Sequence, residues 1–122
     1  MVASGEEASF VHEMSLCEAI AATVAKHSDG LPVTAVVVKI GHFRQVVPDA
    51  LEFCWGMLTE GTELDGAKLV IEQVPALMSC DDCKVEAILD MPILMCAACG
   101  SQNVTLLTGE EFQIVSFDVE EN

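Results

Sequence analysis

The segment CDDCKVEAILDMPILMCAAC, residues 80–99, decides how the rest of the chain can be arranged. It contains two Cys-x-x-Cys motifs, Cys80/Cys83 and Cys96/Cys99, separated by twelve residues. Two residues between cysteines let both sulfurs of a tight turn face one ion, and two such turns complete a tetrahedron with bonds of ~2.3 Å. The spacing therefore predicts a closed four-cysteine site that holds zinc in a structural role.

Other interpretations of these cysteines remain open, namely an iron site of the rubredoxin type or two disulfides. Zinc is favoured by the spacing and by a reducing compartment. A redox Cys-x-x-Cys is weaker, because neither pair follows a strand and opens a helix. Gly100 follows the second motif, where a positive φ is often needed, whereas Lys84 stands at the same place after the first.

Composition limits the classes of partner. The 122 residues suffice for one domain, or for one domain with a small insertion, and 52% of them are hydrophobic. Five Lys and Arg face twenty Asp and Glu, a net charge of −15, which disfavours nucleic acid and membrane partners. No apolar run approaches the ~20 residues of a membrane span. Residues 1–10 lack the basic start of a signal peptide, so we expect a cytoplasmic protein.

Two helices are predicted from apolar periodicity. In residues 13–27, Leu16, Ile20 and Val24 recur every fourth residue and form one buried face. Pro48 opens the second helix. Its predicted buried stripe consists of Leu51, Cys54, Trp55 and Leu58. Cys17 and Cys54 fall on these buried faces, where they are interpreted as small apolar residues.

Three segments are rich in strand-forming residues, namely 32–41, 67–74 and 110–121. We therefore predict an α+β fold, a small three-stranded sheet with two helices on one face, interrupted by a zinc-ribbon-like insertion with two Cys-x-x-Cys knuckles. The α/β domain comprises 11–75 plus 109–122, and the insertion comprises 76–108. About thirty residues cannot build a sufficient core alone, so the insertion needs its metal.

With these features in place, the chain resembles the HypA/HybF family of hydrogenase nickel-incorporation proteins. The resemblance implies a nickel-binding domain and a zinc-binding domain, and delivery of Ni²⁺ to the large subunit of a [NiFe]-hydrogenase with the partner GTPase HypB. The motifs that carry it are HEMSLCEAI (12–20), VVVKIGHF (36–43), VVPDALEFCW (46–55), GTELDGAKLVIEQVP (61–75), the two knuckles with CGS (99–101), and GEEF (109–112).

The resemblance implies that His12 is the principal nickel ligand and that Glu13 is its neighbour in the site. Family members begin Met-His-Glu, so an α-amine and amide nitrogens can join the imidazole, a donor set that suits Ni²⁺. Here Val11 stands where the family has its first Met. We expect residues 1–10 to be a flexible leader or a mis-called start. Without the α-amine, nickel should bind more weakly.

The rival function is a zinc-ribbon module that binds proteins or nucleic acid and has no nickel role. A nucleic-acid module would place basic and aromatic residues around its knuckles, but these hold Asp81, Asp82 and two alanines. No nucleophile–base pair or phosphate-binding glycine loop is present, so we predict no enzyme activity. His27 and His42 are interpreted as surface residues, and Asp49 as a partner of a helix dipole. The sequence leaves the oligomeric state open.

Overall fold

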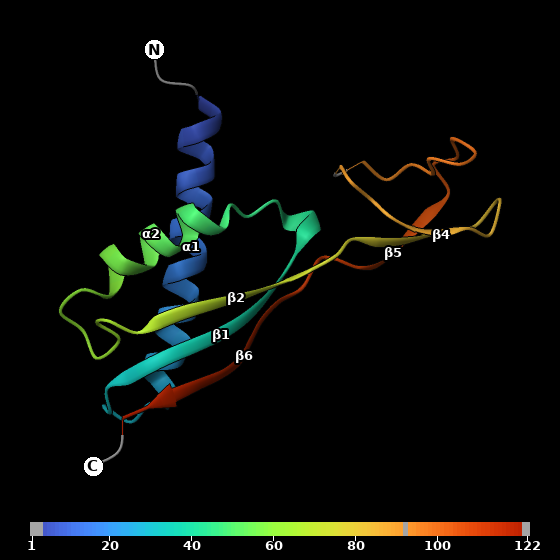
Figure 1. Ribbon diagram of the computed structural model, residues 1–122. Coiled ribbons are helices and arrows are strands. Elements are labelled where there is room, and N and C mark those ends of the chain that lie inside the picture. Colours follow the sequence, from blue (N-terminus) through green and yellow to red (C-terminus); the bar gives the residue numbers. More distant parts are fainter. Residues whose placement is uncertain (1–3, 92, 121–122) are drawn as a thin grey trace. The chain divides into compact units, whose positions relative to one another are not determined.

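Figure 1 shows the computed structural model, which describes the backbone of residues 4–91 and 93–120. The elements in chain order are α1 (Ser4–His27), β1 (Val33–Gly41), the short helix η1 (His42–Arg44), α2 (Pro48–Thr59), β2 (Lys68–Val74), β3 (Leu77–Cys80), β4 (Glu86–Ile88), β5 (Val104–Thr108) and β6 (Phe112–Val119). No helix in this part of the chain is long and apolar enough to cross a membrane.

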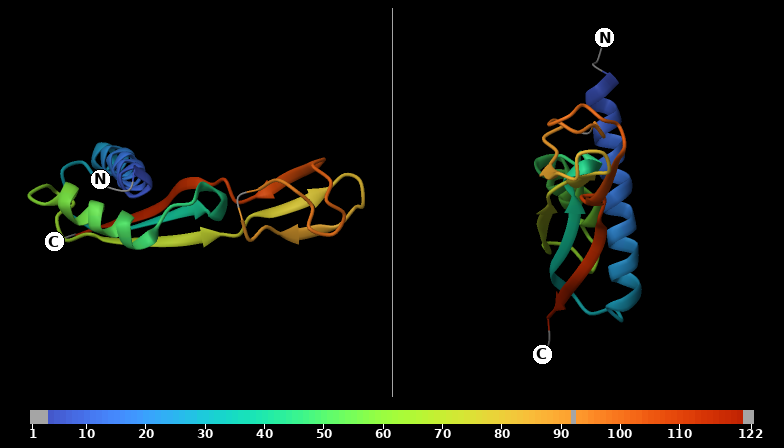
Figure 2. Two further views of the ribbon diagram at one scale, coloured as in Figure 1. Left: turned by 90° about the horizontal axis from the view of Figure 1, so that it is seen from above. Right: turned by 90° about the vertical axis from the view of Figure 1, so that its right-hand side faces the viewer.

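The first sheet has the strand order β2-β1-β6, with β1 in the centre. The helices α1 and α2 lie on one face of it (Figures 1 and 2). Val36, Val38 and Ile40 alternate along β1 and are buried, because neighbouring residues of a strand point to opposite faces. The predicted three-stranded sheet with two helices on one face is confirmed.

Helix α1 ends at His27, as predicted, but it begins at Ser4 rather than at Glu13. The predicted stripe of Leu16, Ile20 and Val24 is buried. Residues 1–10 were expected to be a flexible leader or a mis-called start; residues 4–10 continue the helix, and residues 1–3 lie outside the described part of the chain. His12 and Glu13 therefore lie inside α1 and not in its first turn.

Helix α2 carries the predicted buried stripe. Leu51, Cys54 and Trp55 are buried, and Leu58 is half-buried. The indole nitrogen of Trp55 donates a hydrogen bond to the carbonyl of Ala67 at 3.0 Å, so this large side chain is buried without an unpaired polar atom.

The second sheet lies in the cysteine-bearing segment and has the order β4-β3-β5. Strand β3 pairs antiparallel with both neighbours, for example Met78 with Ala87 and with Leu106. The sequence did not predict these strands, because each is only three to five residues long and their apolar residues form no clear pattern. Beneath them is a small core of Ala76, Met78, Cys80, Leu89 and Cys96.

Residue contacts divide the chain into two compact units. The first is built from the described residues up to Val38, from Val46–Ile71 and from Ile114 onward, and the second from Lys39–Gln45 and Glu72–Gln113. Segment 39–45 lies in the second unit because the amide of Gly41 donates to the carbonyl of Glu111 at 2.7 Å. The sequence placed this segment with the helices.

Candidate metal centres

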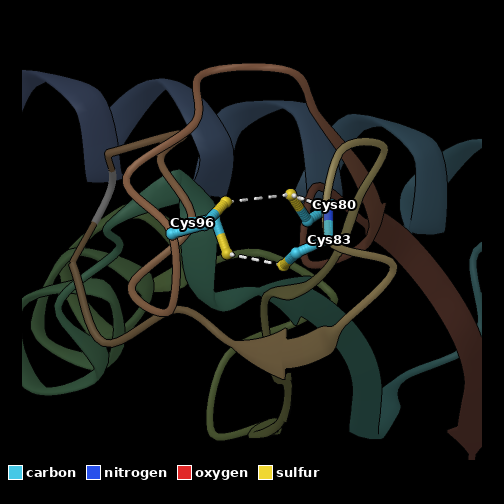
Figure 3. A group of neighbouring side chains, drawn as sticks. Cys80, Cys83 and Cys96 are labelled. Atoms are coloured by element: carbon cyan, nitrogen blue, oxygen red, sulfur yellow. Dashed lines mark hydrogen bonds between the residues drawn. The ribbon is translucent and has the colours of Figure 1, made fainter.

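The four cysteines of the two motifs form one cluster. Their sulfur atoms all lie within 4.8 Å of one another. The sulfur of Cys80 is 3.7 Å from that of Cys99, and the sulfur of Cys83 is 3.6 Å from that of Cys96. Figure 3 shows Cys80 and Cys83 on one turn, with Cys96 facing them from the other.

These sulfur–sulfur distances distinguish a bound metal ion from two disulfides. A tetrahedron with metal–sulfur bonds of ~2.3 Å has an edge of roughly 3.8 Å, close to both sulfur–sulfur distances. A disulfide needs ~2.05 Å between its sulfurs, and all four cysteines are free. The arrangement therefore fits a tetrahedral metal ion and does not fit two disulfides.

The two knuckles have the same backbone hydrogen bonds. In the first, the amide of Lys84 donates to the carbonyl of Cys80 at 3.0 Å; in the second, the amide of Gly100 donates to the carbonyl of Cys96 at 2.7 Å. Both donor residues are left-handed, with φ of 67° for Lys84 and 77° for Gly100. The turn geometry therefore recurs even though the first knuckle has no glycine.

Each knuckle contributes one buried and one exposed cysteine. Cys80 and Cys96 belong to the small core, whereas Cys83 and Cys99 are exposed. Backbone hydrogen bonds from Cys99, and also from Ala98, lower the pKa of Cys96 to about 7 despite its burial. These amides favour the thiolate, which is the form that binds a metal ion.

A polar contact joins the first knuckle to the residues after the second. The hydroxyl of Ser101 donates to a carboxylate oxygen of Asp82, and the side-chain amide of Asn103 donates to the same oxygen at 3.3 Å. From the sequence alone, Asp82 indicates only that the first knuckle is acidic. Its partners are distant in sequence, so no local pattern could have indicated this contact.

The second candidate centre is at His12 and Glu13. The Nε2 atom of His12 is buried and has no hydrogen-bond partner among the described residues. A buried polar atom without a partner is costly, so such an atom is a candidate for binding a ligand. Glu13 is wholly buried, and its Oε2 atom accepts a hydrogen bond of 2.8 Å from the amide of Val47.

Two buried cysteines lie close to this carboxylate. The sulfur of Cys17 donates to the carbonyl of Leu51 at 3.3 Å. Burial, together with the charges of Cys54 and Glu13, raises the pKa of Cys17 to about 12, and burial and Glu13 also raise the pKa of Cys54. Both therefore remain neutral thiols at pH 7, in agreement with their interpretation as apolar core residues.

The remaining candidates are not brought together. His27 is exposed, with its Nδ1 atom 2.8 Å from the carbonyl of Thr23, and His42 and Asp49 are also exposed. Among the described residues, the four cysteines are the only group of three or more His, Cys, Asp or Glu side chains placed to hold one ion. The structure thus clusters the predicted zinc ligands and places His12 in no such group of three or more among the described residues.

Comparison with known proteins gives a consistent result. Residues 11–119 match the family described as "Hydrogenase/urease nickel incorporation, metallochaperone, hypA". The hydrogenase maturation factor HypA of Geotalea uraniireducens is 44% identical over 110 residues, which cover 90% of this chain and 100% of the relative. That of Nostoc punctiforme is 40% identical over 111 residues, covering 91% and 97%.

Among solved structures, the fold is similar to the solution structure of the Ni metallochaperone HypA from Helicobacter pylori. The TM-score is 0.58 and the sequence identity is 20%, and the match covers 88% of this chain and 96% of that chain. At this identity the likeness concerns the fold.

Proposed function

The chain belongs to the HypA family of hydrogenase/urease nickel-incorporation metallochaperones, and on this premise we propose that it binds Ni²⁺ at His12 and delivers it to a [NiFe]-hydrogenase during maturation. The observation that carries the proposal is the buried Nε2 atom of His12, which has no hydrogen-bond partner among the described residues. Imidazole nitrogen is a preferred donor for Ni²⁺. Glu13 is the neighbouring residue of the same site.

Delivery requires that the ion can also leave. Four thiolates would hold a metal too firmly for that purpose, whereas a site with few protein ligands can release its ion to an acceptor. The protein is therefore a carrier and not an enzyme. We place it in the cytoplasm with two protein partners, a GTPase of the HypB type and the large subunit of the hydrogenase.

Calorimetric titration with Ni²⁺ tests the nickel site. His12→Ala should weaken binding by more than about tenfold, because the principal donor is lost. His27→Ala and His42→Ala are matched controls at exposed histidines and should bind as the parent does. Hydrogenase activity in cells that depend on this protein should fall with His12→Ala alone. Unchanged nickel affinity and unchanged hydrogenase activity in that variant would refute the proposal.

We further propose that Cys80, Cys83, Cys96 and Cys99 hold a structural Zn²⁺ ion. The sulfur–sulfur distances of 3.6 and 3.7 Å support a tetrahedral ion, and four thiolates leave no open position for a substrate. The bound ion would cross-link the Cys80/Cys83 knuckle to the Cys96/Cys99 knuckle. The chain itself buries Cys80 and Cys96 and directs backbone amides toward the sulfur of Cys96. Metal analysis should therefore find one zinc per chain.

A further inference from the structure

We propose that Glu13 is a positioning residue. Its carboxylate binds the start of α2, and this contact fixes the direction in which the side chain of His12 projects from α1. The inference rests on the proposed role of His12 as the nickel ligand. It assigns a task to Glu13 that differs from binding the ion through its carboxylate.

The first observation is the burial of Glu13 together with its contact. The side chain is 0% exposed, and its Oε2 atom accepts the 2.8 Å hydrogen bond from the amide of Val47. A buried carboxylate is costly unless hydrogen bonds or positive charge compensate it. This oxygen is therefore held by α2, and a metal ion would have to displace the amide before it could bind there.

The second observation is what α2 lacks. Its N-cap residue is Val47, which has no side-chain acceptor, and its first residue is Pro48, which has no amide hydrogen. In many helices a Glu or Gln at the third helical position accepts a hydrogen bond from the amide of the N-cap residue. That position is Ala50 in α2, which has no acceptor. Here the acceptor and the negative charge come from α1. The charge of Glu13 also faces the positive end of the α2 dipole, which would otherwise repel a cation at the adjacent His12.

Geometry connects this contact to the imidazole. Successive residues of an α-helix project about 100° apart around its axis, so anchoring Glu13 against α2 fixes the rotation of α1 and with it the direction of His12. The Nε2 atom of His12 has no hydrogen bond of its own among the described residues. Its placement therefore depends on the backbone that Glu13 anchors.

Four single variants separate the roles. Glu13→Gln keeps the volume and an oxygen acceptor, whereas Glu13→Ala removes both. Val47→Pro deletes the amide donor from the other partner, and it needs a change of about 25° in φ, from −90° to the value near −65° that proline adopts. Val47→Ala is the matched control, because it shortens an exposed side chain and keeps the donor.

A positioning role predicts that Glu13→Ala and Val47→Pro each weaken Ni²⁺ binding by roughly 10–100-fold, the usual effect of losing a group that orients a metal ligand. The double variant should bind no more weakly than Glu13→Ala alone, because both changes remove one contact. Glu13→Gln should keep most of the affinity. Its nickel X-ray absorption spectrum should match that of the parent, because no carboxylate ligand has been replaced.

A ligand role predicts the reverse: Glu13→Gln would lose as much affinity as Glu13→Ala and would change the spectrum, and Val47→Pro would bind nickel normally. That result would overturn the inference. Chemical unfolding of the metal-free variants tests the contact without nickel, and additive losses of stability for Glu13→Ala and Val47→Pro would also overturn it. The nickel proposal itself has a separate test: it fails if the His12→Ala variant binds Ni²⁺ with unchanged affinity.

Discussion

Lys84 and Gly100 occupy equivalent left-handed positions, each directly after the second cysteine of its knuckle, with φ of 67° and 77°. The same amide-to-carbonyl hydrogen bond closes both turns. A lysine in this conformation carries backbone strain that a glycine does not, of about 1 kcal/mol. The second unit therefore tolerates strain in one of its two cysteine-bearing turns.

Substitutions at Lys84 and Gly100 should change the stability of the protein in opposite directions. Lys84→Gly is expected to stabilise the zinc-loaded protein by up to about 1 kcal/mol, because it relieves the strain. Gly100→Ala should destabilise it by a similar amount. A methyl group at Gly100 meets no atom within 4 Å, so only the positive φ opposes it. Thermal unfolding measures both changes, and equal signs for the two would contradict this account.

Close approach of other backbone atoms also requires glycine at Gly41 and at Gly109, and Gly109 has in addition a positive φ of 116°. A Cβ atom on Gly41 would overlap the carbonyl of Gly109, and one on Gly109 would lie 2.6 Å from the Cα atom of Ala76. Alanine at either position should destabilise the protein by several kcal/mol, since backbone must move. The control is Gly56→Ala in α2, where a methyl group meets nothing and helix propensity should add up to about 1 kcal/mol. Urea unfolding should show this contrast; a tolerated Gly41→Ala would count against the close approach.

Metal removal should affect the two units differently. Trp55 is the only tryptophan and is buried in the first unit, so its fluorescence reports on that unit. We expect a chelator to speed hydrogen exchange at Met78 and Leu106 in the second unit, while the Trp55 emission stays constant. Structural zinc contributes roughly 10–16 kcal/mol of binding free energy near pH 7.

The control for metal removal is Cys83→Ser, which should purify without zinc and show no further change when chelator is added. Cys17→Ala should keep its zinc, because Cys17 lies outside the cluster. A shift of Trp55 emission on chelation would show that the first unit depends on the metal as well.

Alkaline pH should destabilise the first unit through Cys17. Its pKa is raised from 9.0 to about 12, so the folded state holds the proton more tightly than the unfolded chain. This contribution to stability is complete below pH 9 and is lost as the pH rises toward 12. Urea unfolding followed by Trp55 fluorescence should show a decline of a few kcal/mol across that window. Cys17→Ala should flatten the decline; an equally steep profile would exclude this thiol as its cause.

The sequence predicted much of the fold because the relevant signals are local. The stripe from Leu16 to Val24 and the stripe beginning at Leu51 are both buried, and the four cysteines meet as their spacing indicated. Sequence spacing alone sufficed for the knuckles, because two residues between cysteines leave few geometries that bring both sulfurs to one point.

The features that were missed depend on contacts distant in sequence. Strands β3, β4 and β5 are short and are held by pairing with one another. The contact between Glu13 and Val47 spans two helices, and neither residue type indicates it. The position of Lys84 was noted as the place where a glycine was missing, but propensity did not show that a lysine would adopt the left-handed turn.

The unequal exposure of the four cysteines also determines which of them reactive molecules reach first. Cys83 and Cys99 are accessible, and each comes from a different knuckle, whereas Cys80 and Cys96 are enclosed by apolar side chains. An alkylating agent or peroxide therefore reaches one cysteine on each turn first. Alkylation or oxidation would therefore begin at Cys83 and Cys99, and Cys80 and Cys96 would react only after the second unit unfolds.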